Sequence, residues 1–550
     1  MDGPSKRTAR ALFTVVLVLA AGAVASSYAT AEPNVAQTYG SLDATDGSAS
    51  PGQTGVAAPS DRPDGAISAA GGDGARLTDT GDGRPDGAAS ETDGRVLVDP
   101  AEHDPENLTV VGTQGFYASD ERAELVAFDR SGDVAYYDDS YRVYFDVDPV
   151  EGTDYTVEYL ASKHLDGEAC ANVSTERCTY NVFNRVNLTT GEEREVYGEV
   201  TPRIYSARWH DIDRINDTHV AVADILRDSV RVVNTTTDET VWEWNATSHF
   251  PSEVGGADGD WTHINDVEVL DDGRFMVSVR NMDRVVFVDP GEGVDADWTL
   301  GAEDDYDILY EQHNPDYIPP EQGGPAITVA DSENGRVLEY QRVDPDTGNT
   351  TTAADGEWRR SWGWRDSRIQ WPRDADRLPS GNTLVVDTHG DRIAEVAPDG
   401  AVNWSVTVGM PYDVERLATG DESAGGSSMR SIRATRGTTD GSGSRSGVGV
   451  PLFQPANDAG DAGAVPPAGR ITHPDRGPAE AVWAPLKRLA PSIVVNGLLY
   501  AAPSWVRFTD LAFGALALLT ALSWASVELH WSAYAPVRRA RSILRGLRSP

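Results

Sequence analysis

One internal repeat limits the fold of this chain more than any other feature of its sequence. Four segments begin with a ring side chain that is followed three residues later by aspartate: His210-Asp-Ile-Asp213, His263-Ile-Asn-Asp266, His313-Asn-Pro-Asp316 and Trp371-Pro-Arg-Asp374. They start 53, 50 and 58 residues apart. Each leads into two apolar strands separated by a polar turn, and then into a strand that contains tryptophan. Phe145-Asp-Val-Asp148 is an earlier, degenerate copy of the same pattern.

Units of about 50 residues with four short strands are typical of β-propeller blades. Turn dipeptides such as Asp272-Gly273 and Asp399-Gly400 separate the apolar runs, and a helical period is almost absent. The sequence therefore predicts an all-β fold, a six-bladed β-propeller over residues 107–420. The repeat length leaves five to seven blades within range.

The segments on either side of the predicted propeller have a different composition. Residues 32–106 and 421–482 are dominated by Gly, Asp, Ala, Pro and Ser. Such segments bury too little apolar surface to offset the entropy lost on ordering. We predict a disordered acidic spacer over 32–106 and a disordered linker over 421–482.

Both ends of the chain carry apolar runs with basic flanks. Residues 1–31 read as a signal peptide or an N-terminal membrane anchor, and a cleavage-like Ala29-Thr30-Ala31 leaves the two alternatives open. A transmembrane helix is predicted over 509–531, preceded by a juxtamembrane segment over 483–508. The arginine-rich tail at 532–550 is then cytoplasmic by the positive-inside rule. This predicts a cell-membrane protein with an extracellular propeller, whereas a buried helix is the alternative for the second run.

Two further features agree with export. The chain has eight Asn-X-Ser/Thr sequons, which predict a glycoprotein, at Asn107, Asn172, Asn187, Asn216, Asn234, Asn245, Asn349 and Asn403. The only two cysteines, Cys170 and Cys178, can close a short loop by a disulfide in an oxidising compartment. The spacing of these two cysteines does not by itself indicate a metal site.

The net charge is strongly negative. There are 87 acidic residues against 46 Lys and Arg, giving a net charge of −41. This argues against nucleic-acid binding, because little would neutralise a phosphate backbone. An acidic chain with few lysines is typical of a protein from a halophile, where concentrated salt screens the self-repulsion.

The repeat also predicts a site. In a propeller the innermost strand of each blade lines the central channel, so equivalent positions form a ring around it. His210, His263 and His313 are equivalent, and we expect their imidazoles to converge at one mouth of the channel. The alternative is that they are packing residues, like Trp371 and Phe145 at the same position. Histidine at three of the five aligned positions, in a chain with 10 histidines, favours a site.

A cation accompanies these histidines. Where other second strands carry Asp224, Asp331 or Asp387, the blade of His263 carries Arg280. An arginine there favours an anionic ligand over a metal dication, which it would repel. A solvated arginine is the alternative. Asn265 lies two residues from His263, on the same face of the strand, and would add a neutral donor.

With these residues in view, the chain resembles the arylsulfate sulfotransferases over roughly residues 110–415. These are periplasmic six-bladed propellers that move a sulfuryl group from a phenyl sulfate to a phenol without a nucleotide donor. The motifs that carry the resemblance are His210-Asp-Ile, Trp261-Thr-His-Ile-Asn265, Ser278-Val-Arg-Asn281 and Gln312-His313. The family's disulfide near the catalytic region is not reproduced, since both cysteines lie early in the chain.

The resemblance implies a role for each matching residue. His313 corresponds to the nucleophile that becomes sulfurylated, His263 and Asn265 to the His-x-Asn pair, Arg280 to the sulfuryl-binding arginine, and His210 to the remaining active-site histidine. It implies an enzyme with no cofactor and no metal. The membrane anchor predicted from the two ends of the chain is not part of the family's pattern. Tyr317, with its neighbours Tyr306 and Tyr310, is a candidate to stack on the phenol.

The implied chemistry suits these side chains. A neutral imidazole attacks sulfur and expels a phenolate, which splits one hard step into two. Prepositioned donors stabilise the charge, and a second histidine moves the proton. Whether His210 or His263 does so stays open.

Other functions remain as alternatives. A non-enzymatic cell-surface binding propeller would keep the fold without the chemistry. A metalloenzyme could use the three histidines, which suffice to bind zinc. Quinone-dependent propellers need more blades than the length allows. The predicted partners are therefore an aryl sulfate, a phenol and the membrane, whereas the oligomeric state is not predicted.

Overall fold

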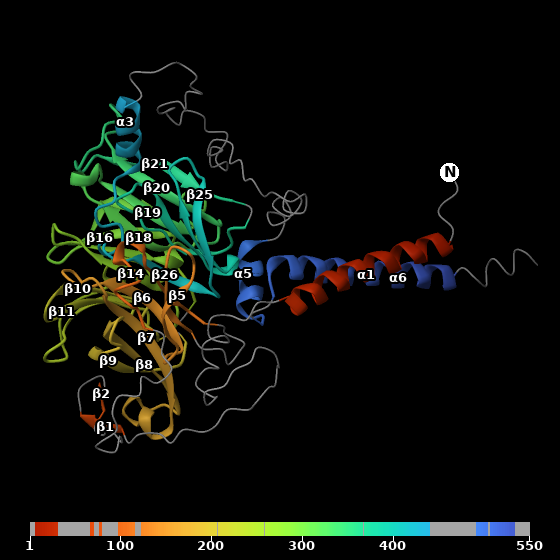
Figure 1. Cartoon of the computed structure of the whole chain (residues 1–550), viewed down its shortest axis with the longest axis horizontal. Helices are drawn as coiled ribbons and strands as arrows, with labels where there is room; N and C mark the ends of the chain where they lie inside the picture. Colours follow the sequence, from red (N-terminus) through yellow and green to blue (C-terminus); the bar gives the residue numbers. More distant parts are fainter. Residues whose placement is uncertain are drawn as a thin grey trace, which may run out of the picture. The chain divides into compact units, whose positions relative to one another are not determined.

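The computed structural model of the chain contains six four-stranded antiparallel sheets (Figure 1). It describes residues 6–30, 67–70, 76–79, 97–115, 123–205, 207–257, 259–366, 368–439, 491–503 and 506–533. Six sheets of the same strand order, each stacked on the next, form a six-bladed β-propeller, as the repeat predicted.

Blades 1 to 3 each use four consecutive strands. Blade 1 comprises β6 (Val143–Pro149), β7 (Thr156–Asp166), β8 (Arg177–Asn187) and β9 (Glu193–Pro202). Blade 2 comprises β10 (Asp211–Asn216), β11 (His219–Asp224), β12 (Ser229–Asn234) and β13 (Glu239–Asn245). Blade 3 comprises β14 (Ile264–Val269), β15 (Phe275–Val279), β16 (Arg284–Asp289) and β17 (Gly293–Gly301).

Blades 4 and 5 repeat this order. Blade 4 comprises β18 (His313–Ile318), β19 (Ala326–Asp331), β20 (Arg336–Val343) and β21 (Glu357–Trp364). Blade 5 comprises β22 (Pro372–Asp374), β23 (Thr383–Asp387), β24 (Arg392–Val396) and β25 (Val402–Thr407). The tryptophan-containing strands found in the sequence are the outermost strands of blades 2 to 5.

Blade 6 closes the ring with both ends of the domain. Its inner strand β26 (Pro411–Arg416) comes last in the chain and pairs with β3 (Thr109–Thr113), which continues into β4 (Leu125–Phe128) and β5 (Val134–Asp138). Hydrogen bonds between β26 and β3 therefore join the two ends of the propeller.

Apolar side chains hold neighbouring blades face to face. Each of six buried clusters lies mainly between two adjacent blades. One joins Val230 and Trp244 of blade 2 to Val277 of blade 3. The inner and middle strands are buried on both faces, which explains their continuous Val- and Ile-rich runs. Such stacking fixes where the first residue of every inner strand lies.

The propeller extends beyond the predicted bounds of 107 and 420. Val98 is buried in the cluster between blades 6 and 1, and its amide donates to the carbonyl of Leu188. At the other end, α3 (Met429–Thr439) packs on blade 4, and the amide of Met429 donates to Glu339. The predicted disorder therefore does not hold for residues 97–106 and 421–439, which have few apolar side chains but enough hydrogen bonds to be ordered.

Most of the other residues for which disorder was predicted lie outside the part of the chain that the structure describes. Between 32 and 96, only the hairpin strands β1 (Ile67–Ala70) and β2 (Arg76–Asp79) are described. Residues 440–490 and the tail at 534–550 lie outside the described residues. Cys170 and Cys178 form the predicted disulfide, at the turn between β7 and β8, where the short helix η3 (Gly167–Val173) lies.

Three helices form a separate unit. Both α1 (Lys6–Thr30) and α6 (Phe508–Ala533) are long and apolar enough to cross a membrane, and α5 (Ser492–Tyr500) is shorter. Helices α1 and α6 pack together and run antiparallel. Arg10 pairs with Glu528, and Phe13 stacks on Trp524 at 5.8 Å between ring centroids. Helix α6 covers the predicted span at 509–531.

Candidate active site

The three repeat histidines meet at the start of the inner strands. His210 and His263 directly precede β10 and β14, and His313 is the first residue of β18. The rings of His210 and His263 have centroids 5.0 Å apart. Tyr412 of β26 lies between His210 and His313, at 6.2 Å and 6.1 Å from their ring centroids. The propeller thus brings together imidazoles that are about 50 residues apart in the chain.

All three imidazoles are held through the same ring nitrogen. Nδ1 of His313 lies 3.1 Å from the carbonyl oxygen of Glu311, and Nδ1 of His210 lies 3.0 Å from that of Arg208. Nδ1 of His263 lies 2.7 Å from Oδ1 of Asp260. Because these oxygens only accept, Nδ1 carries the proton in each ring, and Nε2 bears the lone pair when the ring is neutral. In His313 that lone pair accepts from Nη1 of Arg373.

His313 is kept neutral by its surroundings. It is 1% exposed, and burial lowers its pKa well below the usual value. The nearby guanidiniums of Arg373 and Arg280 lower that pKa further. Ser332 donates to the carbonyl of Pro372 at 2.6 Å, so its oxygen, 2.9 Å from Nδ1 of His313, is free to accept from that nitrogen.

Arg373 is the closest cation to His313. Its Nη1 lies 2.8 Å from Nδ1 of His313 and contacts Nε2 as well. The guanidinium lies over the ring of Trp371, 3.5 Å from the centroid. Burial lowers the pKa of Arg373 to about 10, and its Nε has no hydrogen-bond partner. A buried cation with an unused donor is suited to hold an anion beside His313.

His263 differs from the other two histidines because it has a carboxylate partner. Burial and the Arg280 guanidinium lower its pKa, whereas Asp260 raises it. His263 in turn helps to lower the pKa of Asp260. This pairing resembles the orientation of a general base by an acidic residue.

His210 lies in an aromatic environment. It stacks on Phe145 with centroids 4.6 Å apart, and burial lowers its pKa well below the usual value. Its proton on Nδ1 is held by a backbone carbonyl alone. The ring is thus well positioned as a neutral group but has no carboxylate to stabilise a charge.

Arg280 follows β15, in the short helix η5 (Arg280–Met282), and forms an ion pair with Glu311. Its Nε is buried without a partner. Arg280 also lines a cavity of about 340 Å³, together with Asp260 and a group of acidic and aromatic residues: Asp283, Glu303, Asp304, Tyr306, Tyr310 and Glu311. The cavity is therefore strongly acidic apart from this one arginine.

Asn265 is fully buried on β14. Its Nδ2 donates to the carbonyl of Gln312 at 2.9 Å, while its Oδ1 has no partner. The amide therefore holds the residue that directly precedes His313. One of the two N–H groups of this amide is thus used within the protein.

The tyrosines near His313 separate into two groups. Tyr306 and Tyr310 stack on each other with centroids 4.0 Å apart and line the cavity beside Arg280. Tyr317 instead packs on Phe287, at 5.9 Å, in the core between blades 3 and 4. The structure brings Tyr306 and Tyr310, but not Tyr317, to the cavity.

Three residues at the site were not predicted from the sequence: Arg373, Tyr412 and Asp260. Arg373 occupies the position in Trp371-Pro-Arg-Asp374 that Asn265 occupies in its own repeat, so the repeat itself carried that signal. Tyr412-Asp413 follows the ring-then-aspartate pattern of Phe145-Asp146, but it comes after the last complete blade. Asp260 lies in a loop, where the repeat gives no guide.

The histidines are poor candidates to hold a metal dication. Two guanidiniums lie against them, and each lowers the pKa of His313 by its positive charge. A dication would meet the same repulsion. The arrangement suits a neutral nucleophile next to a bound anion.

Comparison with known proteins finds a family match over part of the chain. Residues 98–353 match the family model described as Arylsulfotransferase (ASST). The match includes His210, His263, Asn265, Arg280 and His313 but ends before Arg373. No curated protein matches the chain.

Solved structures resemble the propeller distantly. A protein of unknown function from Bacteroides caccae is 10% identical, with a TM-score of 0.38 over 57% of this chain and 99% of that chain. The periplasmic gluconolactonase of Pseudomonas aeruginosa is 13% identical, with a TM-score of 0.35 over 57% and 99%. Virginiamycin B lyase from Staphylococcus aureus is 8% identical, with a TM-score of 0.30 over 53% and 83%. We draw nothing about function from them.

Proposed function

We propose that this protein is a membrane-anchored arylsulfotransferase that moves a sulfuryl group from an aryl sulfate to a phenol through a sulfohistidine on His313. One observation supports this proposal above the others. The buried, neutral imidazole of His313 lies against Arg373, whose Nε has no partner, and Arg280 nearby also has a free Nε. A nucleophile beside two unused cationic donors suits attack on an anionic sulfuryl group.

In the first half-reaction, Nε2 of His313 attacks the sulfur and the bond between sulfur and the aryl oxygen breaks. The donor leaves as a phenol after taking a proton from the imidazolium form of His263. In the second half-reaction, neutral His263 takes the proton of the acceptor phenol as its oxygen attacks the sulfohistidine. The proton count balances, and both histidines return to their starting state.

His263 is assigned the proton transfer because of Asp260. That carboxylate accepts from Nδ1 and stabilises the imidazolium, whereas His210 has a backbone carbonyl in the same place. His210, whose Nδ1 proton is held by that carbonyl, is then left to position His263, with the two ring centroids 5.0 Å apart. Asn265 positions the nucleophile through its bond to Gln312.

The cavity beside Arg280 is the place proposed for the aryl ring. Tyr306 and Tyr310 offer a stacked aromatic wall. The carboxylates that surround them disfavour further negative charge on the ring, and concentrated salt would weaken this repulsion. We therefore expect aryl sulfates with neutral or cationic substituents to be better substrates than those with a second anion.

The test is sulfuryl transfer from 4-nitrophenyl sulfate to phenol by the full chain, purified in detergent and molar KCl. We expect activity in the wild type and in His219→Ala, a histidine of β11 outside the site, and none in His313→Ala. Equal activity in His313→Ala and the wild type would refute the assigned nucleophile. A folded wild type that transfers to none of several phenols would favour the binding-propeller alternative.

A further inference from the structure

Besides the histidines, the inner strands carry a second ring of side chains, which are carboxylates. Buried or half-buried acidic residues recur along all six strands: Asp146, Asp148, Asp211, Asp213, Asp266, Glu268, Asp316, Asp374, Asp376, Asp413 and Glu415. Carboxylates so far from water need partners, because a buried charge that is left unpaired is costly.

At five of the six blade junctions, these carboxylates accept from the backbone of the next blade. The acceptor–donor pairs are Asp146 with the amide of Ile212, Asp211 with Val267, Asp213 with Val269, Glu268 with Tyr317, Asp374 with Val414 and Asp413 with Val147, at 2.6–3.3 Å. Within the part of the chain that the structure describes, the junction of blades 4 and 5 has no such bond. The junction of blades 4 and 5 instead holds a cluster of carboxylates.

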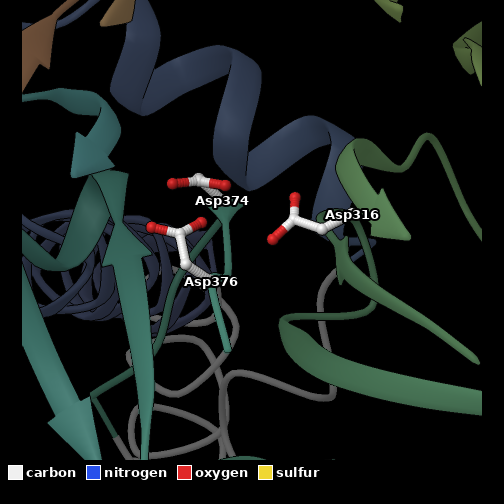
Figure 2. Close-up of side chains that lie close together, drawn as sticks. All are labelled: Asp316, Asp374 and Asp376. Atoms are coloured by element: carbon white, nitrogen blue, oxygen red, sulfur yellow. The ribbon is translucent and has the colours of Figure 1, made fainter. Parts of the chain in front are cut away.

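Three carboxylates converge at the junction of blades 4 and 5 (Figure 2). Asp316 comes from β18, Asp374 from the end of β22, and Asp376 lies two residues further on. One oxygen from each lies within 4.8 Å of the other two, and each residue is 2% exposed.

Oxygens without partners face this cluster. Oδ2 of Asp376 is buried and has no hydrogen bond. Thr328, opposite Asp316 on β19, is fully buried; its hydroxyl faces the Asp316 carboxyl but makes no hydrogen bond of ordinary geometry. Ser423 places a third oxygen 2.6 Å from Oδ2 of Asp316. A neutral hydroxyl and a carboxylate oxygen at this junction are thus both buried and both without a hydrogen-bond partner.

Among the described residues, no arginine or lysine forms an ion pair with the cluster, although the charge of Arg377 acts on Asp316 from its pair with Glu339. Other buried acids of the same blades pair with arginine, as Asp331 does with Arg336 and Glu339 with Arg377. Three carboxylates that lie together without an ion-pair partner can accept a cation.

We propose that Asp316, Asp374 and Asp376 bind a calcium ion that joins blade 4 to blade 5. Calcium takes about six to eight oxygen ligands in flexible geometry, which suits carboxylates and hydroxyls that come from separate strands and loops. Magnesium demands a near-ideal octahedron and usually keeps several of its waters, so a buried site made of protein oxygens favours calcium. The hydroxyls of Thr328 and Ser423, with water, would complete the shell.

The ion would not take part in sulfuryl transfer itself, but it would affect the positions of residues that do. Asp316 lies three residues after His313, and Asp374 directly follows Arg373. Binding at this junction therefore fixes the strand of the proposed nucleophile relative to that of the anion-binding arginine. Only this effect rests on the proposed function; the calcium site itself does not.

The binding test uses the full chain in detergent and molar KCl, stripped with EDTA and dialysed against submillimolar calcium. Elemental analysis should find one calcium per wild-type chain and a loss of it in Asp316→Asn and Asp376→Asn. Asp213→Asn, which neutralises a ring carboxylate of blade 2, is the matched control and should keep the ion. Magnesium should bind at least about tenfold more weakly. No stoichiometric calcium in the wild type, or equal calcium in the two cluster variants, would overturn the proposal.

Thermal unfolding separates a binding defect from misfolding. Saturating calcium should raise the Tm of the wild type by about 5 °C and leave that of Asp376→Asn unchanged. In EDTA, Asp376→Asn should melt above the wild type, because it relieves the repulsion among three adjacent buried carboxyls that have no ion-pair partner. An equal calcium shift in both proteins, or a Tm of the wild type that does not respond to calcium, would contradict the site. Neither readout depends on sulfuryl transfer.

Discussion

Arg373 of blade 5 holds its guanidinium against the imidazole of His313 of blade 4, with Nη1 2.8 Å from Nδ1. The two residues are 60 positions apart in the chain and meet because β18 and β22 are neighbouring inner strands. The contact has two consequences. It lowers the pKa of the His313 imidazole, which keeps the ring neutral and nucleophilic, and it puts a cation where the sulfuryl oxygens would lie.

Replacing Arg373 should therefore affect rate and pH dependence together. We expect Arg373→Ala to lower kcat by about 10²–10³, the usual effect of removing one prepositioned donor. Loss of the cation also raises the pKa of His313, so activity should fail at a higher pH on the acid side. Steady-state kinetics across pH measure both effects, with Arg359→Ala, a half-buried arginine of β21, as control. An unchanged kcat would remove Arg373 from the site.

Asp260 should set the titration of His263. The carboxylate raises the pKa of His263 against the lowering by burial and Arg280. In Asp260→Asn that pKa falls further, so the acid limb of kcat/KM for the phenol acceptor moves to lower pH. We expect kcat to fall by about 10² as the imidazolium loses its partner. The same substitution would leave the pH profile unmoved if His210 carried the proton instead.

The carboxylate ring should make stability depend on pH. Burial raises the pKa of Asp211 to about 7, whereas an unfolded aspartate titrates near 3.9. Between these values the folded state holds a proton that the unfolded state has lost. The free energy of unfolding should therefore fall as pH rises from about 4 to about 7, by up to about 1.4 kcal/mol per pH unit for this group.

Denaturant unfolding at several pH values measures that slope. Asp211→Asn should reduce it while keeping an oxygen to accept from Val267, and Asp346→Asn, an exposed acid, should leave it unchanged. A stability that rises over this range, or equal slopes in the wild type and Asp211→Asn, would contradict the assignment of a proton to the folded ring.

Helix α1 should remain on the mature protein. Its contacts with α6, through Arg10 with Glu528 and Phe13 with Trp524, would be lost if the chain were cleaved after Ala31. We therefore expect the protein isolated from membranes to begin before residue 31 by intact mass. Ala31→Phe, which blocks such cleavage, should have the same mobility on a gel as the wild type. An amino terminus at Glu32 would show that α1 is a signal peptide.

The repeat was sufficient to predict most of the propeller. The same pattern recurs in each blade because every blade packs in the same way against its two neighbours. The pattern consists of a ring residue, an aspartate three positions later and a strand with tryptophan. His210, His263 and His313 could be placed together on that basis alone. The repeat did not predict that β26 closes the ring. This strand pairs with β3, at the opposite end of the domain, and a pattern that recurs about every 50 residues does not indicate such a contact.

Site residues outside the repeat needed the structure. Asp260 lies in a loop, so only the fold brings its carboxylate to His263. Tyr317 is close to His313 in the chain, yet the strand turns its ring toward Phe287 and the core. The cavity wall comes instead from Tyr306 and Tyr310, in the connection before β18. Distance along the chain was a poor guide wherever the backbone leaves the strand.

The most direct test of the central claim is the mass of the protein during turnover. The full chain is mixed with 4-nitrophenyl sulfate in the absence of a phenol acceptor, quenched under alkaline conditions and digested for mass spectrometry. We predict one added sulfuryl group on the peptide that contains His313, lost when phenol is supplied and absent in His313→Ala. Release of 4-nitrophenol by the wild type with no sulfuryl group on any peptide that contains His313 would contradict the sulfohistidine mechanism.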